Sequence, residues 1–117
     1  MYHILLIADN SEVAWMTSRI IERNGYEVET LCRQSDVPIQ EPDVIIVDCA
    51  FSPKVGFAKF NRLFQRFENA KILWVSSTPS EEVNALELGA DDWIKKPFHM
   101  DTFMARIRKL CKRSRST

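Results

Sequence analysis

The sequence has 117 residues, of which 45% are hydrophobic and 27% are charged, and its 16 basic residues balance its 16 acidic ones. These values describe one ordinary globular domain and exclude a second, because a chain of this length builds a single core. No apolar run approaches the roughly 20 residues of a membrane span, and Asp9 ends the first run too early for a signal peptide. We therefore expect a cytoplasmic protein with no membrane partner.

The cysteines and the basic C-terminal segment give no further site. Cys32, Cys49 and Cys111 are far apart and lack C-x-x-C spacing, so neither a disulfide framework nor a zinc site is indicated. Cys49 is expected to be an inert core thiol. After Asp101 the charged residues are all basic, which suits the C-terminal end of a helix better than it indicates nucleic-acid binding by the segment alone.

Five short segments are predicted to be strands. Each is an apolar or alternating run that ends at polar residues, and this is typical of buried strands in a parallel sheet. The segments are residues 2–8, 26–31, 43–48, 71–76 and 92–95.

Helical spacing of apolar residues predicts helices between these strands. They cover residues 12–24, 56–69, 80–88 and 99–113. The residues of the first helix expected to face the core are Val13, Met16, Ile20 and Ile21. Pro38 limits any helix between residues 32 and 42 to one or two turns.

The alternation of strands and helices predicts an α/β fold, a doubly wound five-stranded parallel sheet of the flavodoxin-like (βα)5 type with three layers. Functional sites of such sheets lie beyond the carboxyl ends of the strands. Four polar residues stand at predicted strand ends and are expected to converge there: Asp9, Asp48, Ser76 and Lys96.

This residue set favours phosphoryl chemistry. Carboxylate oxygens suit Mg²⁺, while Lys96 and the hydroxyl of Ser76 can share the charge of a phosphoryl group. One carboxylate would then be the nucleophile and form an acyl phosphate. Asp48 is the better candidate because it ends the central strand.

Several segments together resemble the receiver domain of two-component response regulators. They are Ile4-Leu-Leu-Ile-Ala-Asp-Asn10, Gly25-Tyr-Glu-Val28, Pro42-Asp-Val-Ile-Ile-Val-Asp48, Gly56-Phe57 and Gly89-Ala-Asp-Asp-Trp-Ile-Lys-Lys-Pro-Phe98. The sequence is most similar to the branch whose receivers precede a winged-helix DNA-binding domain. By this resemblance residues 1–112 form the receiver, and residues 113–117 begin a linker or a terminal tail.

The resemblance implies roles for the residues at the strand ends. Asp48 is the phosphoacceptor, and Asp9, Asp48 and the backbone carbonyl of Ala50 are the Mg²⁺ ligands. Lys96 binds the phosphoryl group and is followed by Pro97, which in the family comes after a cis peptide bond.

The resemblance also implies a switch and partners. Ser76 and Trp93 match the switch hydroxyl and the switch aromatic, which would alter the surface of residues 80–88, 92–95 and 99–113. A cognate histidine kinase or phosphotransfer protein supplies the phosphoryl group, and DNA is contacted only through a missing C-terminal domain. The domain is then no enzyme beyond its own phosphorylation and dephosphorylation.

The sequence departs from the family pattern at Ala8, where the family has a second acid. We expect weaker Mg²⁺ binding and slower phosphoryl transfer, because the missing acid acts on the ion through water. An atypical, phosphorylation-independent receiver that serves as an interaction or dimerisation module is the alternative. A haloacid-dehalogenase-like phosphatase would need an acid at Ala50, and a flavodoxin-like cofactor binder would need a phosphate loop after Asp9.

Two further positions concern interfaces. Asp92 and Arg106 match one charged pair of the family's homodimer face, whereas Glu82 and Thr102 do not match a second pair. Trp15 lies off the apolar stripe of its helix, so we expect it on a docking or dimer surface.

Overall fold

The computed structural model describes residues 1–32 and 38–115. Its centre is a five-stranded sheet in the order β2-β1-β3-β4-β5, and every pairing is parallel. The strands are β1 (His3–Ala8), β2 (Glu27–Leu31), β3 (Val44–Asp48), β4 (Lys71–Ser76) and β5 (Asp92–Lys95). The five predicted strands and the predicted fold class are therefore confirmed.

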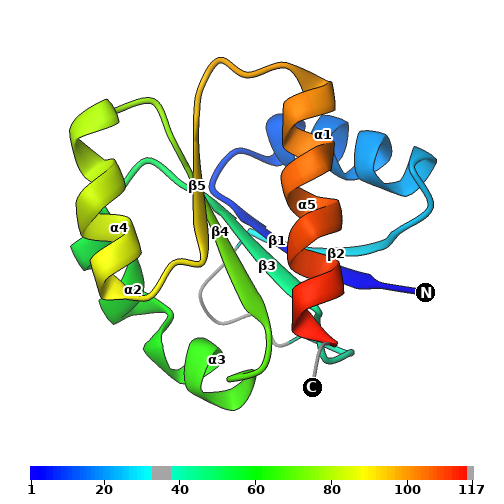
Figure 1. The fold of residues 1–117 in the computed structure, drawn as a ribbon, viewed down its shortest axis with the longest axis horizontal. Coiled ribbons are helices and arrows are strands. Elements are labelled where there is room, and N and C mark those ends of the chain that lie inside the picture. The colour runs from blue at the N-terminus through cyan, green and yellow to red at the C-terminus, as the bar shows by residue number, and fades with distance from the viewer. Residues whose placement is uncertain (33–37, 116–117) are drawn as a thin grey trace.

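The helices form two outer layers. They are α1 (Ser11–Arg23), α2 (Pro53–Lys59), α3 (Asn61–Arg66), α4 (Glu82–Leu88) and α5 (Met100–Ser114), with a short 3₁₀ turn, η1 (Pro79–Glu81), before α4. One face of the sheet is covered by α1 and α5, and the other by α2, α3 and α4 (Figure 1). Right-handed crossovers between parallel strands produce this arrangement.

The central strands are buried on both faces, and alternate side chains serve different layers. In β1, Ile4 and Leu6 join the core under α1 and α5, whereas Leu5 and Ile7 join the core under the other helices. This division follows from the two-residue period of a strand. It explains why β1 is a continuous apolar run in the sequence.

Helix α1 turns part of the predicted side to the core: Ile21 is buried and Ile20 packs against the core cluster. Its buried residues are Ala14, Ser18 and Ile21, while Met16 is 59% exposed, so the prediction that Met16 faces the core is wrong. The polar Ser18 is tolerated inside because its hydroxyl donates to the Trp15 carbonyl over 2.8 Å. The apolar spacing predicted the helix correctly. It did not predict which residues face the core, because one of them is the polar Ser18.

The predicted helix over residues 56–69 is two short helices, and the first begins earlier, at Pro53. Pro53 follows the cap residue Ser52, whose hydroxyl accepts a hydrogen bond from the Val55 amide. The break falls at Phe60, whose backbone leaves helical geometry with φ −104° and ψ 17° and whose ring is buried. The aromatic residues on both sides of the bend, Phe57, Phe60, Phe64 and Phe67, belong to the core on this face of the sheet.

A close approach of backbone and ring fixes the residue at position 56. A Cβ atom added to Gly56 would overlap the Trp74 ring, which also stacks on Phe57 with centroids 5.2 Å apart. Only glycine lets α2 approach β4 this closely.

The other two predicted helices are both present, one of them with a different first turn. The helix over residues 80–88 begins as the 3₁₀ turn η1 and continues as α4, and the helix over residues 99–113 is confirmed as α5. The predicted short helix between residues 32 and 42 falls partly on residues 33–37, which lie outside the described residues. Across the described parts of the chain, every helix is too short or too polar to cross a membrane.

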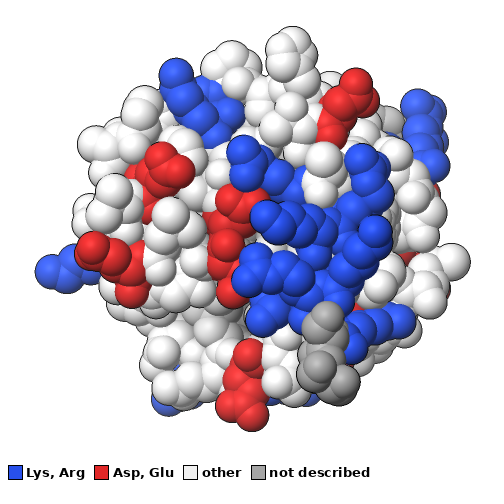
Figure 2. Space-filling view, in the orientation of Figure 1, with Lys and Arg blue, Asp and Glu red and all other residues white. Residues whose placement is uncertain are grey.

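Basic side chains gather over α5, as Figure 2 shows, with acidic side chains beside them. The exposed basic residues of this helix are Arg108, Lys109, Lys112 and Arg113, and Lys112 and Arg113 lie in its last turn. Cations at this position are stabilised by the negative end of the helix dipole.

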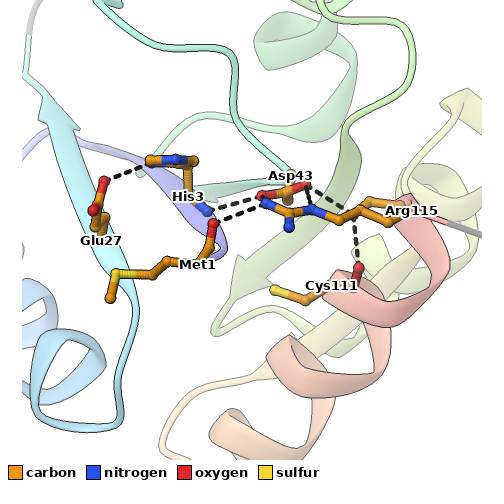
Figure 3. Close-up of polar contacts among 7 residues, drawn as sticks. Met1, His3, Glu27, Asp43, Cys111 and Arg115 are labelled. Carbon is orange, nitrogen blue, oxygen red and sulfur yellow. Dashed lines mark hydrogen bonds and ion pairs between the residues drawn. The ribbon is translucent and has the colours of Figure 1, made fainter.

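Beyond α5, Arg115 ties the end of the helix to the amino end of the sheet (Figure 3). Its guanidinium donates to both carboxylate oxygens of Asp43 over 2.9 Å and to the Met1 carbonyl over 2.8 Å. Its cationic carbon also lies 4.4 Å from the centre of the Tyr2 ring. The contacts of the described chain therefore continue to Arg115.

Asp43 is surrounded by donors at this end of the sheet. In addition to Arg115, the His3 amide donates to it over 2.8 Å and the Ser114 hydroxyl over 3.3 Å. Burial alone would raise the pKa of Asp43, but the hydrogen bonds from Arg115, His3 and Ser114 outweigh it and hold the pKa below its ordinary value. We refer to Asp43, Arg115, His3 and Ser114 as the amino-end clamp.

Candidate functional site

A cavity at the opposite, carboxyl end of the sheet contains the four polar residues singled out in the sequence. Its lining residues are Asp9, Asp48, Cys49, Ala50, Val75, Ser76, Ser77, Thr78, Glu81 and Lys96. They come together because parallel strands end at the same edge of the sheet: Ala8 is aligned with Asp48, and Ser76 with Lys95. The predicted convergence of the strand ends is therefore present in the structure.

Asp48 and Lys96 form an ion pair in this cavity. Lys96 Nζ lies 2.5 Å from Asp48 Oδ1, and the Asp48 side chain is 11% exposed. The strand β3 holds the backbone of Asp48, while the peptide bond between Lys96 and Pro97 is cis, as the resemblance implied. A cation beside this carboxylate can also attract the oxygens of an incoming phosphoryl group.

Asp9 lies on the loop that joins β1 to α1. One of its oxygens, Oδ2, accepts a hydrogen bond from the Ala50 amide over 2.8 Å, which joins this loop to the one after β3. The next residue, Asn10, caps α1 by accepting hydrogen bonds from the amides of Glu12 and Val13. Capping fixes the start of the helix and with it the position of Asp9.

The donor set at this edge fits a magnesium ion. Asp9, Asp48 and the Ala50 carbonyl offer hard oxygen atoms, and Mg²⁺ prefers oxygen ligands while keeping several waters. Within residues 1–32 and 38–115, no group of three or more acidic, histidine or cysteine side chains is arranged to hold a metal ion. The carboxylates of this donor set are those of Asp9 and Asp48, because the Ala8 side chain is buried and has no ligand atom.

Glu81 also lines the cavity, although it does not stand at the end of a strand. Its Oε1 accepts a hydrogen bond from the Ser76 hydroxyl over 2.5 Å. The residue ends η1, directly before α4, and only the folding of this turn brings it back toward β4. A proline followed by acids after a strand end was the available signal, since Pro79 suits the start of a helical turn.

The predicted switch aromatic is buried in the fold, whereas the predicted interface pair is partly exposed. The Trp93 ring is 8% exposed, and its indole nitrogen, in the part of the chain described, is buried without a hydrogen-bond partner. Asp92 and Arg106 pair with each other within one chain, with Arg106 Nη1 3.0 Å from Asp92 Oδ2. The side chains of Arg106 and Asp92 remain 39% and 22% exposed while they make this internal contact.

Cys49 directly follows β3 and lines the cavity. Burial, together with the charges of Asp9 and Asp48, raises the pKa of this thiol to about 12. The thiol therefore stays protonated near neutral pH and is a poor nucleophile. This agrees with the expectation of an inert thiol.

Trp15 is exposed, as expected, with 62% of its surface accessible. Met16 lies beside it with 59% accessible, and the two line a shallow apolar hollow together with Ser11 and Glu12. The guanidinium of Arg19 lies 5.4 Å from the centre of the Trp15 ring. This apolar surface is at the start of α1, close in sequence to Asp9.

The fold and the cavity define a doubly wound α/β domain with an acidic and lysine-containing site at the carboxyl ends of its strands. The family described as the response regulator receiver domain matches residues 4–108, and the chain belongs to this family.

Among its curated relatives, the chain is 32% identical over 120 residues to the transcriptional regulatory protein YvcP of Bacillus subtilis, covering 97% of this chain and 50% of that protein. It is 30% identical over 120 residues to the phosphate regulon transcriptional regulatory protein PhoB of Rhizobium meliloti, covering 96% of this chain and 53% of that protein. The chain thus spans about half the length of the curated relatives it matches. Both relatives are named as transcriptional regulatory proteins, which agrees with the predicted similarity to response regulators that control transcription.

Solved structures share the same fold. A two-component response regulator from Clostridium difficile superposes with a TM-score of 0.82 at 17% identity, covering 99% of this chain and 100% of that one. The response regulator TrrA from Thermotoga maritima, in complex with Mg²⁺-BeF, gives a TM-score of 0.77 at 19% identity, covering 94% of this chain and 99% of that one.

Proposed function

We propose that this domain accepts a phosphoryl group on Asp48 from a histidine kinase or phosphotransfer protein, in a Mg²⁺-dependent step. The observation that carries the proposal is the Asp48–Lys96 pair in a cavity that also contains Asp9 and Ser76. Membership of the receiver family supports it.

In the proposed step an Asp48 carboxylate oxygen attacks the phosphorus atom of a phosphohistidine. A P–O bond forms as the P–N bond breaks, and the imidazole nitrogen leaves with the electron pair and takes up a proton. A bound Mg²⁺ ion would offset the negative charge of the phosphoryl oxygens. Asp9, Asp48 and the Ala50 carbonyl would hold it, while Lys96 attracts the oxygens of the phosphoryl group that is transferred.

The proposed output is a changed surface over α4, β5 and α5. The Asp92–Arg106 pair lies on this surface and Trp93 is buried in its strand β5, which is hydrogen-bonded to β4, whose last residue is Ser76. We propose that it controls homodimerisation and the activity of a DNA-binding domain, because the matched curated relatives are transcriptional regulators of about twice this length. A local charge event would thereby bias a two-state element.

We also propose that the phosphodonor contacts Trp15 and Met16. These side chains form an exposed apolar surface where α1 begins, next to the loop that carries Asp9. Aromatic residues are typical anchors of protein interfaces.

The test of the proposed acceptor is the intact mass of the protein after incubation with acetyl phosphate and Mg²⁺. The parent protein is expected to gain one phosphoryl group as the P–O bond to acetate breaks, and Asp48→Asn is expected to gain none. Asp101→Asn is the matched control, because Asp101 is an exposed acid at the start of α5. Equal labelling of Asp48→Asn and the parent would place the acceptor elsewhere.

A phosphorylation-independent interaction module is the second candidate function, and Ala8 is the observation that favours it. The side chain at this position is buried and offers no oxygen to a metal ion or its waters. Failure of both acetyl phosphate and a histidine kinase to label the parent protein would support this candidate.

A further inference from the structure

The hydroxyl of Ser76 is already engaged in the structure. It donates to Glu81 Oε1 over 2.5 Å and accepts a hydrogen bond from the Thr78 amide over 3.0 Å. A serine hydroxyl has one proton to donate. Because Ser76 is 8% exposed, this proton is committed to Glu81 rather than shared with bulk water.

The backbone of η1 places Glu81 for this contact. Pro79 starts the turn, and the Glu81 amide donates to the Thr78 carbonyl over 3.0 Å. Glu81 is partly buried and lines the cavity that contains Asp48 and Lys96, whereas the next residue, Glu82, is exposed and lies outside its lining. Two adjacent residues of the same type thus have different surroundings.

We propose that Glu81 is a positioning residue that holds Ser76 away from the phosphoryl group, so that phosphorylation must displace Glu81 before Ser76 can respond. This inference rests on the proposed phosphorylation of Asp48. It adds a residue and a contact that the receiver resemblance did not indicate.

The two uses of Ser76 exclude each other. Its single proton goes either to Glu81 or to a phosphoryl oxygen, and the engaged Glu81 carboxylate faces the same cavity as the incoming negative charge. Lys96 is the cation among the lining residues, and it is already paired with Asp48. Each event therefore opposes the other, and thermodynamic reciprocity requires that weakening the Glu81 contact favours phosphorylation.

The contact also connects the cavity to α4. Glu81 is the last residue of η1, and α4 begins at Glu82. Displacement of Glu81 therefore loosens the first turn of α4. The helix bears exposed apolar residues, among them Val83 and Leu86. The Ser76–Glu81 contact therefore relates the charge at Asp48 to the α4 surface.

The first experiment compares the rates of labelling by acetyl phosphate and Mg²⁺ in Glu81→Ala, Glu81→Gln and Glu82→Ala. Loss of one hydrogen bond predicts labelling of Glu81→Ala about fivefold faster than that of the parent. The rate of Glu81→Gln lies between them, because an amide oxygen still accepts the hydrogen bond without the charge. Glu82→Ala is the matched control and keeps the parent rate. Equal rates in Glu81→Ala and Glu82→Ala overturn the proposal.

The second experiment needs no phosphorylation. In the unphosphorylated protein, Glu81→Ala is expected to shift the NMR resonance of the Thr78 amide and to speed hydrogen exchange in the first turn of α4, and Glu82→Ala is expected to leave the Thr78 resonance in place. An unmoved Thr78 resonance in Glu81→Ala overturns the proposal. A parent protein that takes no phosphoryl group would instead count against the proposed function, while the Thr78 result still decides the role of Glu81.

Discussion

Two aspartates at opposite ends of β3 show how one strand separates a structural carboxylate from the proposed phosphoacceptor, which lies at the carboxyl end of the sheet, here called the acceptor end. Asp43, just before the strand, and Asp48, its last residue, are almost equally buried, with side chains 13% and 11% exposed. Their partners differ. Asp43 accepts hydrogen bonds from His3, Ser114 and Arg115, whereas Asp48 pairs with Lys96 in an open cavity.

The difference teaches that partners, rather than burial, distinguish the two ends. A structural carboxylate has its oxygens saturated by donors, which is the usual state of buried polar groups. The carboxylate at the acceptor end faces space in which a metal ion or a phosphoryl group can become its partner. Proteins commonly sacrifice some stability for such sites.

Exchanging the two cations for alanine gives the sharpest test of this contrast. Lys96→Ala is expected to slow phosphoryl transfer from acetyl phosphate about a hundredfold, because it removes a charge aimed at the reacting group, and to spare the fold. Arg115→Ala is expected to lower the thermal midpoint while leaving the labelling rate unchanged. Intact mass over time and far-UV circular dichroism measure the two effects. A loss of fold in Lys96→Ala, or of labelling in Arg115→Ala, would break the contrast.

A second acid at the acceptor end should strengthen its proposed metal site. Ala8→Asp restores the acid that the family normally has, and we expect Mg²⁺ to bind about tenfold more tightly, the scale of outer-ligand effects. Isothermal titration with Mg²⁺ measures this, with Asp9→Asn as the control that weakens binding. An unchanged affinity would show that position 8 does not influence the ion.

The acceptor end also bears the exposed aromatic surface. Trp15→Ala is expected to slow phosphoryl transfer about fivefold, as for a modest interface residue. The donor in this test is the histidine kinase that labels the parent protein fastest. Labelling by acetyl phosphate should not change, and the thermal midpoint should move little because the side chain is exposed. Val83→Ala is the matched control, since Val83 is also 62% exposed but lies on α4. A large loss of stability in Trp15→Ala with normal transfer would contradict the docking role.

The amino-end clamp predicts a pH dependence with a definite sign. The pKa of Asp43 is lowered from its ordinary value of 3.8, so its contribution to folding is present above that pH and is lost as the pH falls through the folded pKa. Asp43→Asn should lower the thermal midpoint at pH 7 by about 4 °C, the shift for about 1 kcal/mol in a domain of this size. Thermal scans from pH 7 to 3 should show this deficit shrinking below pH 4. A deficit that stayed constant would mean that the charge of Asp43 is irrelevant.

Much of this molecule could be predicted from the sequence because its signals are local. The apolar runs that end at Asp48 and Ser76 specified buried strands, and parallel order then brought their ends together. The break at Phe60 could not be predicted, since the aromatic spacing on its two sides is continuous and tertiary packing decides the bend. Met16 was misplaced because the hydrogen bond that lets Ser18 be buried is visible only in three dimensions.

The site residues at strand ends could be predicted from the sequence. The site residue that lies on a turn could not. Asp9, Asp48, Ser76 and Lys96 follow from the strand pattern. Glu81 reaches the same cavity through the path of η1, which residue spacing does not report. The Asp43–Arg115 contact joins residues 72 positions apart, and no local pattern announces it.

The bond from Arg115 to the Met1 carbonyl brings the first residue and the end of the last helix into contact. The covalent path of the chain therefore nearly closes into a ring. A peptide of a few residues between the two ends would complete the ring, and the domain becomes a candidate for circular permutation, with new ends opened in an exposed loop such as the one at Gly25. In such a permuted chain the strand that leads to Asp9 would lie in the interior of the sequence, after the other four strands.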